Sequence, residues 1–453
     1  MNRYRRLIAS SLAAVPLVLV RARAHAETTT LKIPQPFPGG GIGNLVRDFG
    51  AVGDAKRVTD AAISSGSSTL TSATAKFVAG DAGKSIGVQG AGPGGANFIT
   101  TIAGRTDSTT VRLGASAQSS VSSAHAVYGT DCTTAFQNAF NSAQSSGLSL
   151  SLHVPQGQYF IAGPLQDTSN ANSQIVFPAR DYGRYPQIAI DVWGDTPENH
   201  SGWSIVEVAP QSDGSVIHSM ASCLDPTSGW SGAAIFGGGT NIGGSPGSGV
   251  MMLFRNLIIH TYPNPTVGGI NGQNIQSLHV ANCAVDAGTQ NLGTIAAPTN
   301  QSFAIAWPRT NNSNNGGAEW VNVFGYYTGF RWYELFEGGK IMAFCCWNAF
   351  ELGNTHHASH VRYAANALCK NGIVHKRIAQ NGNPPNEHYF KIDVHDIEHD
   401  TNSGNKWYGG GYDLVDPNNY LHGVLDYLTI QTSVGFDHIY RKNGGLRVTS
   451  REL

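Results

Sequence analysis

After residue 150 the chain consists mainly of short apolar runs separated by Gly, Asn, Pro and Ser. This pattern is typical of short β-strands joined by turns. Residues 131–146 differ, because their apolar residues repeat at helical spacing and form one stripe. The members of the stripe are Ala135, Phe136, Ala139, Phe140 and Ala143. The pattern therefore predicts an all-β chain with one amphipathic helix.

Similar triplets that begin with a β-branched residue recur in the C-terminal half at residues 321–323, 341–343 and 361–363, a spacing of 20. The run at 254–259 is followed by a similar one at 275–280. A period near 20 residues with short strands suits one coil of a parallel β-solenoid, in which each coil buries its inward residues on its neighbours. A leucine-rich repeat has a similar period, but its fixed Leu and Asn positions are missing.

The composition of the 453 residues agrees with a turn-rich β architecture. Charged residues make up 13%, about half of the ~25% in ordinary globular chains. The 41% of hydrophobic residues allow a large core and exclude disorder. A formal net charge of −1 provides no basic field for nucleic acid.

The N-terminus has the features of an export signal. Three arginines among the first six residues precede an apolar stretch at 7–20, and residues 24–26 supply a small-x-small cleavage site. We expect a signal peptide at 1–26 and a secreted or periplasmic protein; an N-terminal membrane anchor is the alternative. No later segment is apolar for long enough to span a bilayer, so we expect no membrane contact after signal removal.

The six cysteines contain no C-x-x-C pair, so the sequence gives no support for a zinc or thioredoxin-like motif. Export permits disulfides. We expect most of the cysteines to be small buried residues, with at most one bridge. The adjacent Cys345 and Cys346 should point to opposite faces of a strand.

Three motifs resemble those of the pectate lyase superfamily, including its polygalacturonase-, rhamnogalacturonase- and tailspike-like members. They are Val-Arg-Asp-Phe-Gly-Ala-Val-Gly-Asp at 46–54, Gly-Thr-Asp at 129–131 before the helix, and Val-Pro-Gln-Gly-Gln-Tyr at 154–159. The resemblance implies a right-handed parallel β-helix whose N-terminal end is capped by the amphipathic helix. It also implies a polysaccharide ligand in a lateral groove.

The predicted organisation departs from most members, in which the opening motif runs straight into the helix. Here a segment with strand-like alternation intervenes, and we expect it to form a small β-rich insertion. The predicted segments are a signal peptide (1–26), a first-coil segment (27–60), the insertion (61–128), the parallel β-helix (129–435) and a C-terminal tail (436–453).

Residues 320–347 are rich in aromatic side chains, which can stack on sugar rings. The best candidates for exposed, substrate-binding aromatics flank the turn at 328–329: Tyr326, Tyr327, Trp332 and Tyr333. The alternative for each is an inward core position.

A cluster of acids and histidines at 391–400 is the first candidate for catalysis. On a strand, Asp393 and His395 share one face, and Asp396 follows. Glycoside hydrolysis needs two carboxylates, and this cluster could supply them or a cation site. The alternative is a solvated coil edge.

The second candidate comes from the 20-residue period, which places Glu319, Lys340 and His360 in register. The same period aligns Asn322, Met342 and Arg362. Such a site could abstract a proton from a uronic acid and hold its carboxylate through Arg362. Ordinary surface charge is the alternative.

These candidates leave several functions open. Hydrolysis of an extracellular polysaccharide is the first choice, with Asp393 and Asp396 as the carboxylates. The alternatives are β-elimination by a polysaccharide lyase, epimerisation, and non-catalytic tailspike-like glycan binding. The polygalacturonase signature and the Asp-rich calcium sites of pectate lyases are missing. We expect no metal or other cofactor, with Ca²⁺ as the one alternative, and a homotrimer is an alternative to a monomer.

Overall fold

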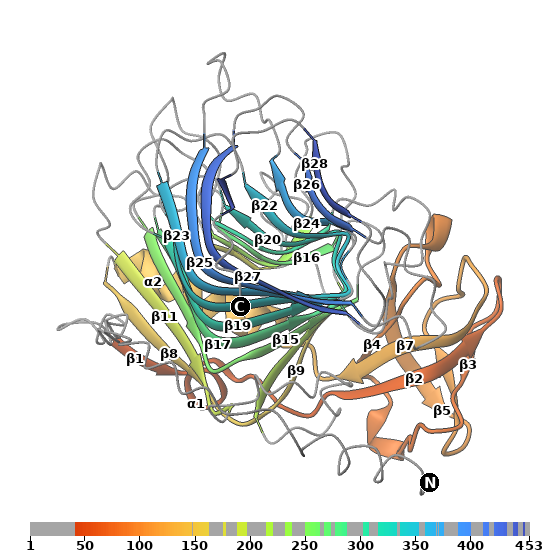
Figure 1. The fold of residues 1–453 in the computed structure, drawn as a ribbon. Helices are drawn as coiled ribbons and strands as arrows, with labels where there is room; N and C mark the ends of the chain where they lie inside the picture. Colours follow the sequence, from red (N-terminus) through yellow and green to blue (C-terminus); the bar gives the residue numbers. More distant parts are fainter. Residues whose placement is uncertain are drawn as a thin grey trace, which may run out of the picture. The chain divides into compact units, whose positions relative to one another are not determined.

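The computed structural model describes only part of the chain, all of it within one unit at 36–453. The described residues are 41–146, 148–162, 175–177, 188–196, 214–220, 232–237, 250–262, 267–272, 277–287, 302–307, 316–332, 336–352, 358–367, 369, 371–375, 388–399, 411–415, 421–432, 438–442 and 447–448. Most of these residues lie in β-strands, and many of the strands are stacked side by side (Figure 1).

A parallel sheet of 14 strands dominates the described structure. Its main path is β1 (Gly41–Asn44), β8 (Leu150–Val154), β11 (Ile188–Gly194), β14 (Val250–Arg255), β17 (Ser277–Asp286), β19 (Gly316–Phe324), β21 (Phe336–Phe344), β23 (Ala358–Ala367), β25 (His388–His399), β27 (Leu421–Thr432) and β29 (Arg447–Val448). A branch joins β9 (Gly157–Ile161), β12 (Ser215–Ser219) and β15 (Ile258–Thr261) to β17.

A second parallel sheet has nine strands. They are β10 (Ile175–Phe177), β13 (Gly232–Gly237), β16 (Val267–Asn271), β18 (Phe303–Ala306), β20 (Thr328–Trp332), β22 (Asn348–Leu352), β24 (Asn371–His375), β26 (Gly411–Val415) and β28 (His438–Lys442). From β18 to β28 the chain alternates between the two sheets. Large parallel sheets with this alternation fit a parallel β-helix, in which each coil gives one strand to each sheet.

The strand register corrects part of the alignment expected from the sequence. Asn322 pairs with Met342, as the 20-residue period requires. The next coil is longer, because Gly338 pairs with Val361, 23 residues on. Lys340 therefore pairs with Tyr363, and the expected alignments of Lys340 with His360 and of Met342 with Arg362 are wrong. The alignment of Glu319 with Lys340 is also wrong, because Ala318 pairs with Gly338 and Glu319 therefore lies opposite Gly339. A fixed period fails as soon as one coil gains residues.

Inward side chains from successive coils form one continuous core. Val280, Ala318, Val361 and Ile392 are buried in one register column, with Gly338 between Ala318 and Val361. Helix α2 (Thr133–Ser146) adds its apolar stripe to the same core, including Phe136 and Phe140. The short helix α1 (Leu45–Phe49) precedes it, capped by the side chain of Asn44.

Residues 56–129 form a closed antiparallel barrel with the strand order β2-β3-β6-β5-β4-β7. The strands are β2 (Lys56–Ile63), β3 (Thr69–Thr71), β4 (Ser85–Val88), β5 (Phe98–Arg105), β6 (Thr110–Leu113) and β7 (Val121–Gly129), with 3₁₀ turns at η1 (Ala79–Asp81) and η2 (Pro93–Gly95). The barrel has its own core, which includes Leu70, Phe77 and Ile86. Closure leaves no free sheet edge.

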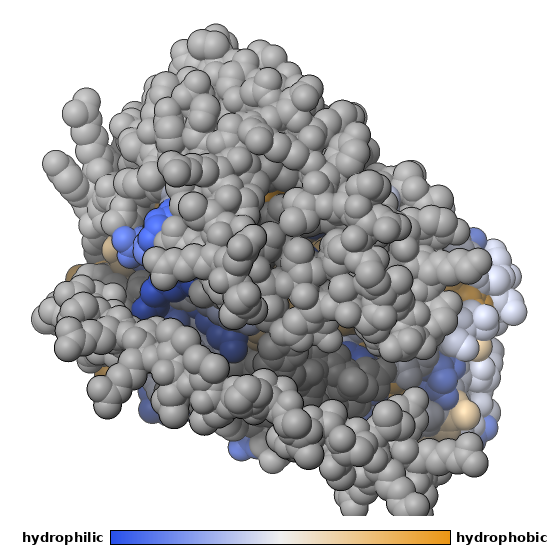
Figure 2. Space-filling view, in the orientation of Figure 1, coloured by the Kyte–Doolittle hydropathy of each residue, from blue (hydrophilic) through white to orange (hydrophobic). Residues whose placement is uncertain are grey.

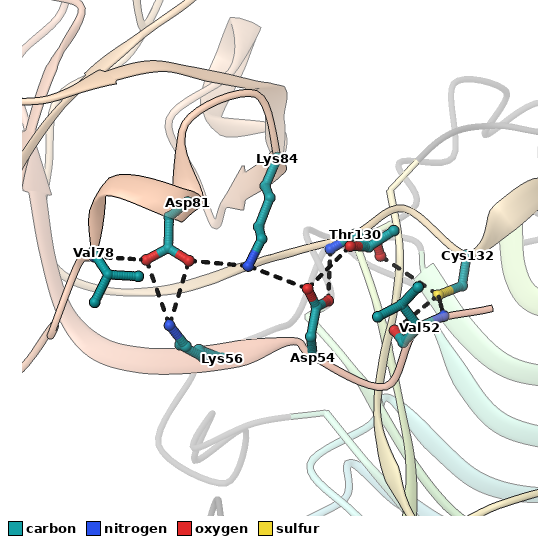
Figure 3. Close-up of polar contacts among 8 residues, drawn as sticks. All are labelled: Val52, Asp54, Lys56, Val78, Asp81, Lys84, Thr130 and Cys132. Atoms are coloured by element: carbon teal, nitrogen blue, oxygen red, sulfur yellow. Dashed lines mark hydrogen bonds and ion pairs between the residues drawn. The ribbon is translucent and has the colours of Figure 1, made fainter. Parts of the chain in front are cut away.

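An ionic network joins the barrel to the segment that precedes helix α2 (Figure 3). Asp81 is fully buried and contacts Lys56 and Lys84 at 3.3 and 3.1 Å. Lys84 also contacts Asp54 at 3.1 Å, and Asp54 accepts hydrogen bonds from Thr130. Burial alone raises the pKa of Asp81, but hydrogen bonds and the two ammonium groups outweigh it and lower that pKa.

Five described cysteines are free and buried: Cys132, Cys283, Cys345, Cys346 and Cys369. The expectation for the adjacent pair is wrong, because β21 ends at Phe344 and Cys345 turns the chain with a φ of 53°. No helix in the described part of the chain is long and apolar enough to cross a bilayer.

Candidate functional site

Polar and aromatic side chains gather on the face of β19, β21, β23 and β25 that points away from the core. In β23, for example, Val361 is buried whereas His360 is exposed and Arg362 is half-buried. We call this group the outer patch; its members are Glu319, Trp320, Glu337, Lys340, His360, Arg362, Tyr363, Lys391 and Asp393. Figure 2 shows hydrophilic residues gathered over the left-hand part of the sheet.

Asp393 of β25 contacts an imidazole and an ammonium group of the outer patch. Its Oδ2 atom lies 2.9 Å from Nε2 of His360, and its Oδ1 atom lies 2.7 Å from Nζ of Lys391. Burial raises the pKa of Asp393, but the hydrogen bonds from Lys391 and His360 outweigh it, so the pKa lies below its usual value. The carboxylate therefore stays ionised and can fix the orientation of the imidazole.

Arg362 forms an ion pair with Glu319, although a whole coil lies between β19 and β23. The residue between them is Gly339, because Ala318 pairs with Gly338 and Gly338 with Val361. A Cβ atom at Gly339 would collide with the Glu319 carboxylate. The missing side chain is therefore what lets the two charged groups meet across the coil.

Lys340 lies between two aromatic rings. Its Nζ atom is 4.7 Å from the centroid of Trp320 and 5.3 Å from that of Tyr363, which are cation–π distances. Trp320 is 45% exposed and has a φ of 55°. Among the described residues the ammonium group contacts rings rather than a carboxylate, so it can attract an anionic ligand.

A second polar group lies on β8, β11 and β14, and sequence reasoning missed it. The ring of His153 stacks on Trp193 with centroids 4.0 Å apart, and Arg255 lies over the same indole at 5.5 Å. Arg255 also binds both carboxylate oxygens of Asp191, at 2.9 and 2.7 Å. The available signal was Asp191 between the apolar residues Ile190 and Val192, with Trp193 two positions on and so on the same face of a strand.

The structure corrects two of the expected aromatic residues. Tyr326 and Trp332 are 0% and 1% exposed, so the expectation that they lie on the surface is wrong. Both pack in the continuous core. Tyr326 follows the turn at Gly325, which has a φ of 78°, and Trp332 ends β20, all of whose residues are buried. Tyr327 is half-buried and stacks against Trp347, and Tyr333 lies outside the described residues.

The structure brings some of the catalytic candidates together, and the side chains of others lie outside the described residues. His360 and Asp393 are in contact, Arg362 lies two residues from His360, and Lys340 lies on the neighbouring strand. His395 and Asp396 lie further along β25, where they pair with Ala364 and Ala365, but their side chains are outside the described part. Across the described residues no group of three or more metal-binding side chains comes together.

Comparisons with known proteins give little guidance. The sequence matches no protein family and no curated protein. Among solved structures it is similar to the Gp54 tailspike of Acinetobacter baumannii bacteriophage AP22, which was solved in complex with A. baumannii capsular saccharide. The two sequences are 8% identical, the match covers 87% of this chain and 68% of that chain, and the TM-score is 0.18. It is also similar to the Agl-KA catalytic domain, with 11% identity, 84% and 97% covered, and a TM-score of 0.17. Such low scores carry no argument, so the site is interpreted from its own residues.

Proposed function

We propose that the chain is an exported enzyme that binds an acidic polysaccharide across the outer patch and cleaves it by β-elimination. The observation that supports this most is the 2.9 Å contact between His360 and Asp393. Arg362 lies two residues from His360 on the same strand. It combines an oriented imidazole with a cationic group on one surface. Export rests on the signal expected at 1–26, and a homotrimer stays an untested alternative.

The proposed chemistry follows from the atoms of this pair. With Nε2 of His360 held by Asp393, the neutral imidazole carries its proton on Nε2, and Nδ1 is the basic atom. Nδ1 takes the proton next to the uronate carboxylate, and Arg362 and Lys340 stabilise the enolate that forms. The C–O bond of the glycosidic linkage then breaks at the adjacent carbon, which is β to the carboxyl group. A double bond forms between these two carbons, and the leaving oxygen takes up a proton from water.

The electrostatics of Asp393 argue against its serving as the general acid of the hydrolysis preferred from the sequence. A hydrolase needs a carboxylic acid that holds its proton near neutral pH, which requires a raised pKa. The pKa of Asp393 is instead lowered. Asp393 therefore suits the role of a group that orients His360, and not that of a general acid.

Hydrolysis remains the second candidate because of Glu337. This residue is exposed on β21 and pairs in register with His360, so carboxylates lie on the strands either side of the imidazole. Asp396 is the further carboxylate expected for this reaction. The two candidates differ in what they require of the substrate, since only elimination requires the uronate carboxyl group.

The test uses matched polymers, each uronate polysaccharide beside its carboxyl-reduced neutral counterpart. Elimination predicts cleavage of the acidic polymer alone, with an ultraviolet-absorbing unsaturated product. Equal cleavage of both polymers, without that absorbance, would establish hydrolysis. Binding of the acidic polymer without new chain ends would move the protein to the glycan-binding class.

A further inference from the structure

Three successive coils place a left-handed residue at the same corner of the 14-stranded sheet. Asn256, Asn282 and Trp320 have φ values of 57°, 48° and 55°. The strand pairings of β14, β15, β17 and β19 put the three residues in one register column, one coil apart. Each coil therefore turns the corner in the same way, but with a different side chain in the third.

Asparagine suits this corner and tryptophan does not. Asn tolerates the left-handed region, and here Nδ2 of Asn282 donates to Oδ1 of Asn256 at 2.9 Å. A third asparagine would continue this hydrogen-bonded column. Trp320 ends it and puts a bulky side chain into a conformation that bulky residues avoid. Backbone strain of this kind is found mainly where function maintains it.

Burial does not compensate for the strain, because Trp320 remains 45% exposed. Its contact with Lys340, at 4.7 Å, involves one face of the indole. Among the described residues, no ring or cation is recorded against the opposite face. An exposed indole with a cation behind it is a stacking surface that also favours an acidic group nearby.

We propose that Trp320 is the residue on which a sugar ring of the acidic polysaccharide stacks, with Lys340 backing the indole. This rests on the proposed function for the class of ligand. It assigns ring binding to a residue at a strained corner, in place of the aromatic residues that flank the turn at 328–329. The strain is then the cost of holding the indole on the surface beside Lys340 and next to Glu319, the partner of Arg362.

The test compares Trp320→Asn with Trp320→Tyr, both in a His360→Gln background so that the polymer is bound but not cleaved. Calorimetric titration with the acidic polymer should show about ten-fold weaker binding for Trp320→Asn. Trp320→Tyr, which keeps a ring, should bind within about three-fold of its parent. The thermal midpoint of Trp320→Asn should rise by about 2 °C, since the asparagine column is extended.

Unchanged binding by Trp320→Asn would overturn the assignment, as would a lowered thermal midpoint, which would show that the indole stabilises the fold. Loss of binding in Trp320→Asn together with hydrolysis by the unmodified chain would leave the assignment intact and refute elimination. If the chain binds no acidic polymer, the assignment and the proposed function both fail.

Discussion

His360 and Asp393 are 33 residues apart in sequence but lie on adjacent strands, with Nε2 of the imidazole 2.9 Å from Oδ2 of the carboxylate. The contact is diagonal, because His360 pairs in register with Lys391, and Asp393 is two residues further along β25. A parallel stack of coils can therefore build a base and its orienting carboxylate from residues that no local sequence motif joins.

Replacing the proposed base should abolish cleavage without abolishing binding. We expect His360→Gln to lower kcat by about 10²–10⁴-fold, the usual contribution of general acid–base catalysis. Affinity for the polymer should change little, because His360 acts in the reaction and not in ring stacking. The measurement is initial rate against polymer concentration, with calorimetric binding in parallel. Full activity in His360→Gln would exclude the mechanism.

Asp393→Asn separates the two catalytic candidates. Loss of the carboxylate removes the group that fixes the imidazole tautomer, so kcat should fall by about 10²-fold or more. Asp396→Asn is the matched control, because elimination gives Asp396 no role whereas hydrolysis uses it as the second carboxylate. A large loss in Asp396→Asn with little change in Asp393→Asn would favour hydrolysis instead.

Gly339→Ala tests the ion pair between Arg362 and Glu319. The added Cβ collides with the flexible carboxylate end of Glu319, which can move away, so the free energy of unfolding should change by less than about 1 kcal/mol. Displacement of Glu319 releases Arg362 and should alter KM for the acidic polymer several-fold. Unchanged KM would show that this pair does not contribute to binding.

A buried group of histidines should make stability depend on pH. Burial, and then the charge of Arg57, lower the pKa of His125 to about 4. Burial and the neighbouring His260 and Arg57 also lower that of His218. Asp286, 3.1 Å from His260, acts in the opposite direction on His125. Both histidines are therefore neutral in the folded protein at neutral pH.

The sign of the effect follows from proton uptake. Because the unfolded chain protonates these histidines near pH 6.5 and the folded chain does not, stability present above that pH is lost as the pH falls. For His125 the loss at pH 5 is about 2 kcal/mol. Urea unfolding at pH 7 and pH 5 measures it, and His125→Gln should reduce the difference between the two. An equal difference in the variant would contradict this assignment.

Local pattern predicts some of this structure and fails where distant segments decide. The apolar stripe at 135–143 depends only on helical spacing, and its residues lie within α2. Closure of the barrel depends on the pairing of β2 with β7, and the other barrel strands lie between these two in the sequence. No local sequence pattern predicts such a pairing. The residues at 320–332 show the same limit, because a corner decides which aromatics point inward.

The same reasoning explains the mixed result for the catalytic candidates. Asp393 and His360 were each recognisable as charged or polar residues on strands, but their contact depends on the register between β23 and β25, in which His360 pairs with Lys391. Arg362 reaches Glu319 only because Gly339 has no side chain. Such relations across coils become visible only when the register is known.

The most direct test of the central claim is the stoichiometry of cleavage on an acidic polymer that the protein binds. New reducing ends and the ultraviolet absorbance of unsaturated uronate are followed in one reaction over time. Elimination through His360 predicts one unsaturated product for each new reducing end, and neither signal with His360→Gln. Reducing ends that accumulate without absorbance, or cleavage that persists in His360→Gln, would contradict the account.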